Sequence, residues 1–275
     1  MESIRRYVSS AGYTAIQSDH VNNRRWCWCL IILVLISGCV FIGNAIAYYA
    51  HTYVWFNIGL PSPEEVAKWD DYKIYNTLYK LSRWDGFNSG AQFNQFVCAQ
   101  IRPLGLNSSD KFHFLEVGVG VGAFSLEIMH MFPLSIGTGI DYAPAAIEIA
   151  KVVLPLHRMT VKVGDMQKID SEGSKFHNVF VPGAFCLLFS MDHAYSTMAE
   201  LERVLKPGGG LCISLLPSET SASVGACNIR IPKKFWLEEM TFRYGFTVLS
   251  LEEMDDWHLP HSMGRYNVCL RKPLK

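Results

Sequence analysis

The sequence contains little charge. Asp, Glu, Lys and Arg together make up 18% of its 275 residues. Lys and Arg number 25, and Asp and Glu also number 25, so the formal net charge is zero. The balance argues against a protein that binds nucleic acid through a globally basic surface, and we expect no nucleic-acid partner. Because 49% of the residues are hydrophobic, disorder or a coiled coil along the whole chain is excluded as well.

Charge is missing altogether between Arg25 and Glu64. The apolar centre of this stretch predicts a transmembrane helix over residues 26–50, since about 25 residues at ~1.5 Å each span a hydrocarbon core of ~30 Å. Aromatic residues stand at both ends of the span, as at the two membrane surfaces. A cleaved signal peptide is the alternative, because Ala45-Ile46-Ala47 has a small-x-small form. The run is longer than a signal peptide requires, which favours an uncleaved single-pass anchor in an endomembrane.

The flanking charges predict the orientation of this helix. Residues 1–25 form a basic tail with four arginines, whereas Glu64 and Glu65 are the first charges after the span. The positive-inside rule then places the N-terminus in the cytoplasm and the rest of the chain across the membrane. A stripe of small residues, Cys39, Gly43 and Ala47, allows a homodimer through the helix.

Cysteine usage points to the opposite side. Five cysteines lie outside the predicted span, and their odd, scattered set predicts no disulfide framework, which suits a reducing compartment. Cys212 and Cys269 are expected to be buried as small apolar side chains. The sequon Asn107-Ser108-Ser109 permits a lumenal position instead. The side of the membrane therefore stays open.

Residues 51–63 are expected to be a linker, and residues 64–275 a single domain of alternating strands and helices. Helices are expected over residues 64–80 and 91–101. Strands are then expected over 112–117, 135–140, 159–163, 178–181, 211–216, 246–251 and 266–270, with helices over 123–132, 143–153, 192–205 and 233–244. This alternation predicts a mostly parallel sheet covered on both faces. No helix separates the last two strands, so the last one is expected to run antiparallel.

A glycine-rich loop follows the first of these strands and opens a helix. It reads Glu116-Val117-Gly118-Val119-Gly120-Val121-Gly122. Glycines there allow a tight turn and a close approach of a ligand to the backbone. The run also satisfies a dinucleotide-binding fingerprint, so a nicotinamide-dependent oxidoreductase is an alternative. Three further features lie at the end of an expected strand or in the turn that leads into one: Asp141, Gly164-Asp165-Met166 and Lys206-Pro207-Gly208-Gly209-Gly210.

These features together resemble the class I S-adenosylmethionine-dependent methyltransferases of the small-molecule type. The resemblance implies a Rossmann-like seven-stranded sheet with a reversed last strand, and S-adenosyl-L-methionine as cofactor. It implies that Gly118, Gly120 and Gly122 pass beneath the methionine part. It implies that Glu116 helps to hold the amino group and Asp141 the ribose. Asp165 and Met166 would hold the adenine. Pro182-Gly183-Ala184 departs from the family pattern and offers only backbone, so Pro182 is expected to contact the cofactor through its backbone.

The acceptor side of the site is less defined. His258, and after it His261, are the candidate general bases, in a segment of acids and an aromatic that joins the last two strands. No spacing there indicates a closed metal site, and we expect none. The expected acceptor is a small molecule, a lipid or a glycan. The unusual end of the fourth strand leaves a second hypothesis, a catalytically inactive methyltransferase-like module that binds ligand at the membrane.

Overall fold

The computed structural model describes residues 60–68, 90–188, 190–217, 231–253 and 265–275. The predicted basic tail and membrane helix lie outside the described residues, as does most of the linker. Among the described residues, no helix is long and apolar enough to cross a bilayer. The part of the chain from Gly59 to Lys275 forms one compact unit, and it contains the predicted domain.

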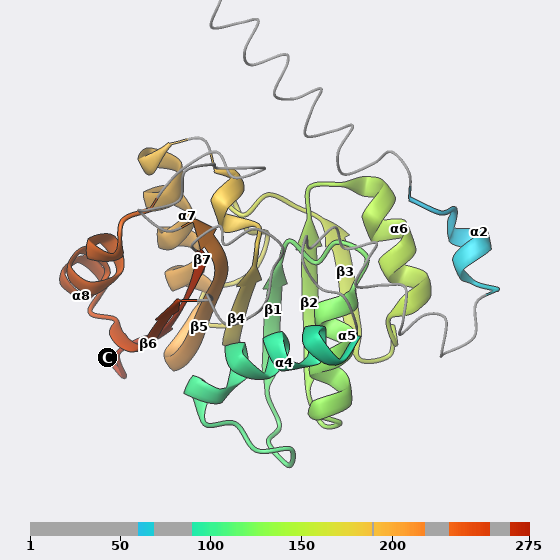
Figure 1. The fold of residues 1–275 in the computed structure, drawn as a ribbon, viewed down its shortest axis with the longest axis horizontal. Coiled ribbons are helices and arrows are strands. Elements are labelled where there is room, and N and C mark those ends of the chain that lie inside the picture. Colours follow the sequence, from blue (N-terminus) through green and yellow to red (C-terminus); the bar gives the residue numbers. More distant parts are fainter. Residues whose placement is uncertain (1–59, 69–89, 189, 218–230, 254–264) are drawn as a thin grey trace, which may run out of the picture. The chain divides into compact units, whose positions relative to one another are not determined.

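Seven strands form a single sheet in the order β3-β2-β1-β4-β5-β7-β6 (Figure 1). The neighbours among β1 to β5 are parallel, whereas β7 is antiparallel to both β5 and β6. The predicted mostly parallel sheet with a reversed last strand is therefore confirmed. The strands are β1 (His113–Val117), β2 (Ile136–Asp141), β3 (Met159–Val163), β4 (Phe176–Pro182), β5 (Leu205–Pro217), β6 (Thr247–Glu253) and β7 (Arg265–Arg271).

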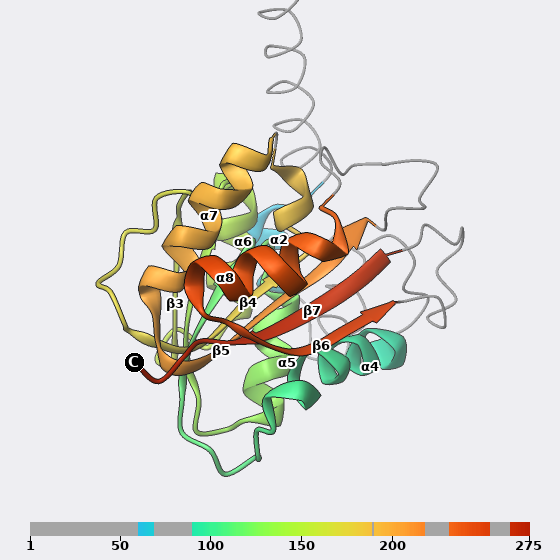
Figure 2. The ribbon, with the colours of Figure 1, turned by 90° about the vertical axis from the view of Figure 1, so that its left-hand side faces the viewer.

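Helices cover both faces of the sheet. Figure 2 shows α4 and α5 on one face and α7 and α8 on the other. The helices are α2 (Pro63–Val66), α4 (Gly90–Ile101), α5 (Ala123–Met131), α6 (Pro144–Val153), α7 (Met191–Val204) and α8 (Met240–Tyr244), with a π-helical turn over Phe235–Glu239. The last predicted helix, 233–244, is thus built from the π-helical turn and α8. The continuation expected from Glu64 to Lys80 lies largely outside the described residues.

The core has an aromatic layer under α4 and α5. Phe96 of α4 and Phe124 of α5 meet edge to face, and Phe124 packs on Phe180 of β4 with ring centroids 5.5 Å apart. On the other face, Met198 and Leu201 of α7 are fully buried against the sheet. Burying a side chain of this size contributes roughly 1.5–3 kcal/mol, so these layers fix the strands whose ends form the site.

One predicted turn is part of a strand instead. Lys206-Pro207-Gly208-Gly209-Gly210 was expected to form a turn before the fifth strand, but β5 already begins at Leu205. Phe176 of β4 pairs with Leu205, but Asn178, two residues further on, pairs with Gly210. The extra residues on the β5 side, which include the glycines, therefore form a bulge within the strand. A Cβ atom on Gly210 would lie 2.4 Å from a methyl carbon of Leu104, which explains why only glycine fits in this pairing.

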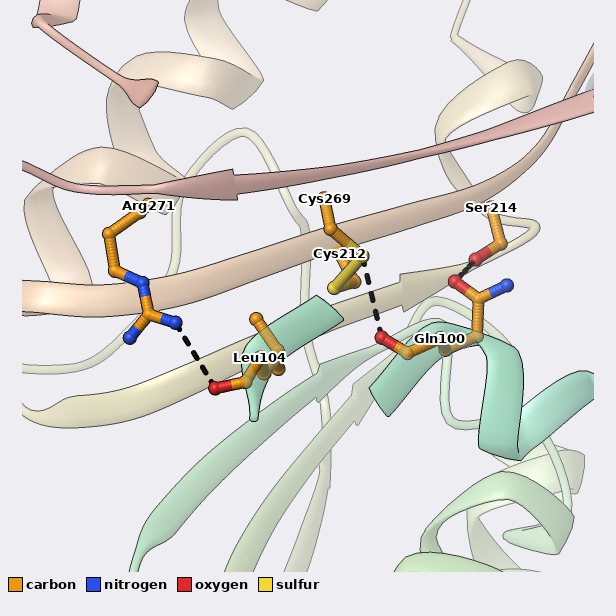
Figure 3. Close-up of a disulfide and its surroundings, with 6 residues drawn as sticks. All are labelled: Gln100, Leu104, Cys212, Ser214, Cys269 and Arg271. Carbon is orange, nitrogen blue, oxygen red and sulfur yellow. Dashed lines mark hydrogen bonds between the residues drawn. A yellow bond between two sulfur atoms is a disulfide. The ribbon is translucent and has the colours of Figure 1, made fainter. Parts of the chain in front are cut away.

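The predicted burial of Cys212 and Cys269 is confirmed, but the prediction of no disulfide was wrong. Cys212 of β5 and Cys269 of β7 are not separate buried thiols but form a disulfide, with Cα atoms 4.2 Å apart (Figure 3). They are directly opposite each other in the antiparallel pairing, and each is only 1% exposed. The pairing depends on β7 lying between β5 and β6, an order that spacing along the chain does not reveal. Free Cys98 lies on α4.

Candidate active site

The glycine loop bridges the carboxyl ends of β1 and β2. The backbone N–H groups of Gly118 and Val119 both donate to the carbonyl oxygen of Ile140, at 2.8 and 3.0 Å. The N–H of Gly122 donates to the carbonyl of Val119 at 2.9 Å, which closes the turn into α5. The loop is therefore held in place by backbone bonds before any ligand binds.

The three glycines of the loop meet different surroundings, although each has a positive φ angle. A Cβ on Gly118 would lie 2.5 Å from the Cβ of Ala184, and one on Gly122 would lie 2.8 Å from the side chain of Leu154. A Cβ on Gly120 would meet no atom of the described residues within 4 Å. Gly118 and Gly122 thus permit close packing within the protein, whereas Gly120 faces open space that a ligand can occupy.

Asp141 ends β2 and ties the loop to the next helix. Its Oδ2 accepts a hydrogen bond from the N–H of Gly120 at 2.7 Å, and its Oδ1 accepts one from the N–H of Ala143 at 2.8 Å. Burial raises the pKa of this carboxyl, and these backbone donors oppose the rise. Each oxygen keeps a further lone pair, which suits ribose hydroxyl groups.

Glu116 lies deeper, on β1, and is fully buried. The hydroxyl of Ser125 on α5 donates to its Oε2, whereas Oε1 has no hydrogen-bond partner within the described residues. Burial raises the pKa of Glu116 well above its usual value, and the nearby negative charge of Asp141 adds to the rise. An unsatisfied buried acceptor costs about 1–3 kcal/mol, so this oxygen is suited to a donor supplied by a ligand.

The remaining predicted cofactor residues follow β3 and β4. Asp165 is exposed, and its Oδ1 accepts the N–H of Gln167 at 2.8 Å, while Met166 packs partly against the core. Pro182 is buried at the end of β4, where it pairs with Ser214 of β5. The structure thus brings the predicted acids and glycines to the C-terminal ends of the parallel strands (the carboxyl edge of the sheet), where ligands of open α/β sheets bind.

Two residues at this edge were missed by the sequence analysis: Ser125, which holds Glu116, and Tyr142, which follows Asp141 with 63% of its surface exposed. Ala184 was expected to offer only backbone, but its side chain lies against Gly118. Only Tyr142 carried a sequence signal, as an aromatic residue directly after a strand-ending acid. His258 and His261 lie outside the described residues. Within the residues that the structure describes, no group of His, Cys, Asp or Glu is placed to hold a metal ion.

The arrangement fits a positively charged nucleoside cofactor. The unpaired oxygen of Glu116 lies on β1, the carboxylate of Asp141 with its free lone pairs ends β2, and Gly120, which faces open space, lies in the loop after β1. Acidic groups at one edge favour a ligand that carries an ammonium or a sulfonium.

Comparison with known proteins agrees with this geometry. Residues 114–209, from β1 into β5, match the family model described as "Methyltransferase domain". The chain is 26% identical over 140 residues to malonyl-[acyl-carrier protein] O-methyltransferase of Priestia megaterium, covering 51% of this chain and 49% of the relative. The chain thus spans about half the length of this curated relative.

Solved structures show the same fold. A putative sarcosine dimethylglycine methyltransferase from Galdieria sulphuraria superposes with a TM-score of 0.56 at 13% identity, covering 78% of this chain and 99% of that one. Phosphoethanolamine N-methyltransferase 2 of Haemonchus contortus, solved with S-adenosylhomocysteine, gives 0.55 at 16% identity and covers 66% and 53%. The described domain therefore has the Rossmann-like fold of these methyltransferase structures, and its residues 114–209 match the methyltransferase family model.

Proposed function

We propose that this protein is an S-adenosylmethionine-dependent methyltransferase that methylates a small-molecule, lipid or glycan acceptor at a membrane. The observation that carries the proposal is the glycine loop bonded to Asp141, with the unpaired oxygen of Glu116 beneath it. The domain match over residues 114–209 supports methyl transfer over the nicotinamide-dependent alternative.

Each residue has a separate task in holding the cofactor. Oε1 of Glu116 accepts an N–H of the amino group, which relieves its own lack of a partner. Asp141 accepts the ribose hydroxyls while it keeps both backbone N–H groups that order the loop. Asp165 and Met166 would contact the adenine, the backbone of Pro182 would contact the methionine part, and the exposed ring of Tyr142 would add an aromatic surface next to Asp141.

S-adenosylmethionine supplies an electrophilic methyl group when it is bound. The protein contributes by holding the acceptor in line with that methyl group, an orientation effect worth up to ~7–11 kcal/mol in favourable cases. His258, with His261 as second choice, removes a proton when the acceptor is a hydroxyl or an ammonium group. A loss of turnover in His258→Ala with cofactor binding unchanged would support this role. Unchanged turnover in both His258→Ala and His261→Ala would exclude a base at these positions.

Cofactor binding by the full-length protein in detergent, measured by calorimetry, tests the proposal. Gly120→Leu should abolish binding because its side chain fills the open space above the loop. Gly105→Leu is the matched control, since Gly105 has a similar φ of 66° and equally free surroundings but lies in a turn before β1. Absence of binding by the unaltered protein would refute the proposal, as would equal losses in the two variants.

The end of β4 favours a second candidate, a ligand-binding module without turnover. Pro182, Gly183 and Ala184 place no polar side chain at the point where β4 enters the site. Incubation with labelled methyl donor and extracts from cells that lack the gene separates the two. A labelled product supports the enzyme, whereas tight cofactor binding without any product supports the module.

The membrane attachment rests on the uncharged stretch between Arg25 and Glu64. We expect the full-length protein to stay with membranes at high salt and to be extracted by detergent. Deletion of residues 26–50 should release the domain. A full-length protein that is washed off by salt would exclude the anchor.

A further inference from the structure

A single sequon, Asn107-Ser108-Ser109, lies in a turn before β1. All three residues are exposed. The N–H of Asp110 donates to the carbonyl of Asn107 at 2.9 Å, and the N–H of Asn107 donates to Oδ2 of Asp110 at 2.9 Å. These bonds present Asn107 and the Ser109 hydroxyl on a surface turn, as an enzyme that modifies a folded or folding chain requires.

This turn lies at the N-terminal ends of the parallel strands, whereas the candidate active site lies at their C-terminal ends. In Figure 1 the segment between α4 and β1 lies below the sheet, and β1 and its parallel neighbours point away from it. β1 alone, with five residues at about 3.3 Å each, separates the two edges by ~16 Å. A bulky group on Asn107 therefore leaves the cofactor loop accessible.

The buried disulfide supplies independent evidence on the compartment. Cys212 and Cys269 are joined across paired strands in the interior. Structural disulfides persist in secreted proteins and in the lumen of the endoplasmic reticulum, and they are rare in the cytosol. The arginines that precede the predicted span predict the same, non-cytoplasmic side for the domain.

We propose that the domain faces an oxidising lumen and that Asn107 is N-glycosylated there. The amide nitrogen Nδ2 of Asn107 bonds to the anomeric carbon of an oligosaccharide carried on a lipid diphosphate. The bond from that carbon to the diphosphate oxygen breaks, the diphosphate leaves with the electron pair, and one amide proton passes to a base. No oxidant or reductant is consumed.

Expression of the full-length chain with a C-terminal tag in animal cells tests the site. The tagged protein should run faster on a denaturing gel after treatment with peptide-N-glycosidase. Asn107→Gln and Ser109→Ala should already run at the faster position and lose the response. Ser108→Ala is the matched control, because it changes the same turn but keeps the sequon, and it should respond like the unaltered protein.

A second variant makes a negative result decisive. Glu172→Asn creates a new sequon, because Gly173 and Ser174 follow it on another exposed segment. If only this variant carries a glycan, the domain is lumenal but Asn107 is not modified, which overturns the assignment. If neither carries one, the lumenal orientation is overturned as well. Because Asn107 is remote from the cofactor loop, Asn107→Gln should keep cofactor binding, so failure of the glycan test is separable from failure of the proposed activity.

Discussion

The backbone N–H of Gly120 donates a hydrogen bond to Oδ2 of Asp141 over 2.7 Å. The bond joins the loop after β1 to the last residue of β2, and the other oxygen of the same carboxylate holds Ala143 at the start of α6. One carboxylate thus orders both the glycine loop and the start of α6, and under the proposed function it is also the acceptor for the ribose hydroxyls.

Asp141→Asn should weaken binding of S-adenosylmethionine by at least about tenfold, equivalent to ~1.4 kcal/mol. The amide NH2 of asparagine would face one of the two backbone N–H groups, so two donors would oppose each other. Calorimetry measures the change. Asp170→Asn removes the same charge from an exposed residue near the amino end of β4 and is the control. Equal affinity in the two variants would contradict the assigned role.

Gly118→Ala should impair both folding and cofactor binding, because the added methyl group would lie 2.5 Å from the Cβ of Ala184. Overpacking of this kind typically costs about 1–3 kcal/mol. Adding Ala184→Gly removes the opposing methyl group and should recover part of the loss, leaving the cost of alanine at a φ of 79°. Urea unfolding of the four combinations measures the coupling. Strictly additive losses would show that the two positions do not meet.

The free energy of unfolding should fall as the pH drops from about 6.5 toward 4. The pKa of His113 is lowered from 6.5 to about 4, first by burial and then by the positive charges of Lys175, His177 and Lys206. The unfolded chain takes up the proton at the higher pH, so acid favours unfolding. The pKa of His177 is also lowered, which adds in the same direction.

His113→Gln should make this fall in stability shallower, measured by chemical denaturation at pH 7 and pH 5. His157→Gln, at an exposed histidine, is the matched control for the substitution itself. A profile for His113→Gln that follows the unaltered protein would exclude His113 as a source of the acid sensitivity.

Loss of the disulfide should destabilise the domain by up to about 4 kcal/mol, because it closes a loop of 57 residues in the unfolded chain. The paired variant Cys212→Ala and Cys269→Ala should unfold at lower urea, and reductant should then have no further effect. Cys98→Ser should keep the response to reductant, since Cys98 takes no part in the bond. Labelling of Cys212 and Cys269 by a maleimide without reduction would show that the bond is absent.

The order of strands and helices was predictable because hydrophobic strand segments alternate with helical ones. At the start of the domain, Ser62 accepts the N–H of Glu65 at 3.2 Å and caps α2, directly before Pro63 and Glu64. Glu116, Asp141 and the glycines were recognisable because their chemistry is carried by a short, local pattern. These parts of the fold and site need only neighbouring residues to be specified.

The rest depends on contacts between distant segments. The partner of Cys212 is set by β7 entering the sheet beside β5, and the partner of Glu116 by the first turns of α5. The start of β5 at Leu205 depends on pairing with Phe176, which overrides the tendency of Pro207 and the glycines to form a turn. Local propensity is a weak guide where tertiary pairing decides.

The contact between Gly118 and Ala184 limits how this site can diversify. Ala184 follows β4 and lies where a Cβ on Gly118 would be, so we expect many larger residues at position 184 to press on the glycine loop. Under the proposed function, we expect acceptor preference to vary more readily at other positions around the C-terminal ends of the strands. An engineer seeking a new substrate range should leave this pair untouched and randomise the other walls of the site.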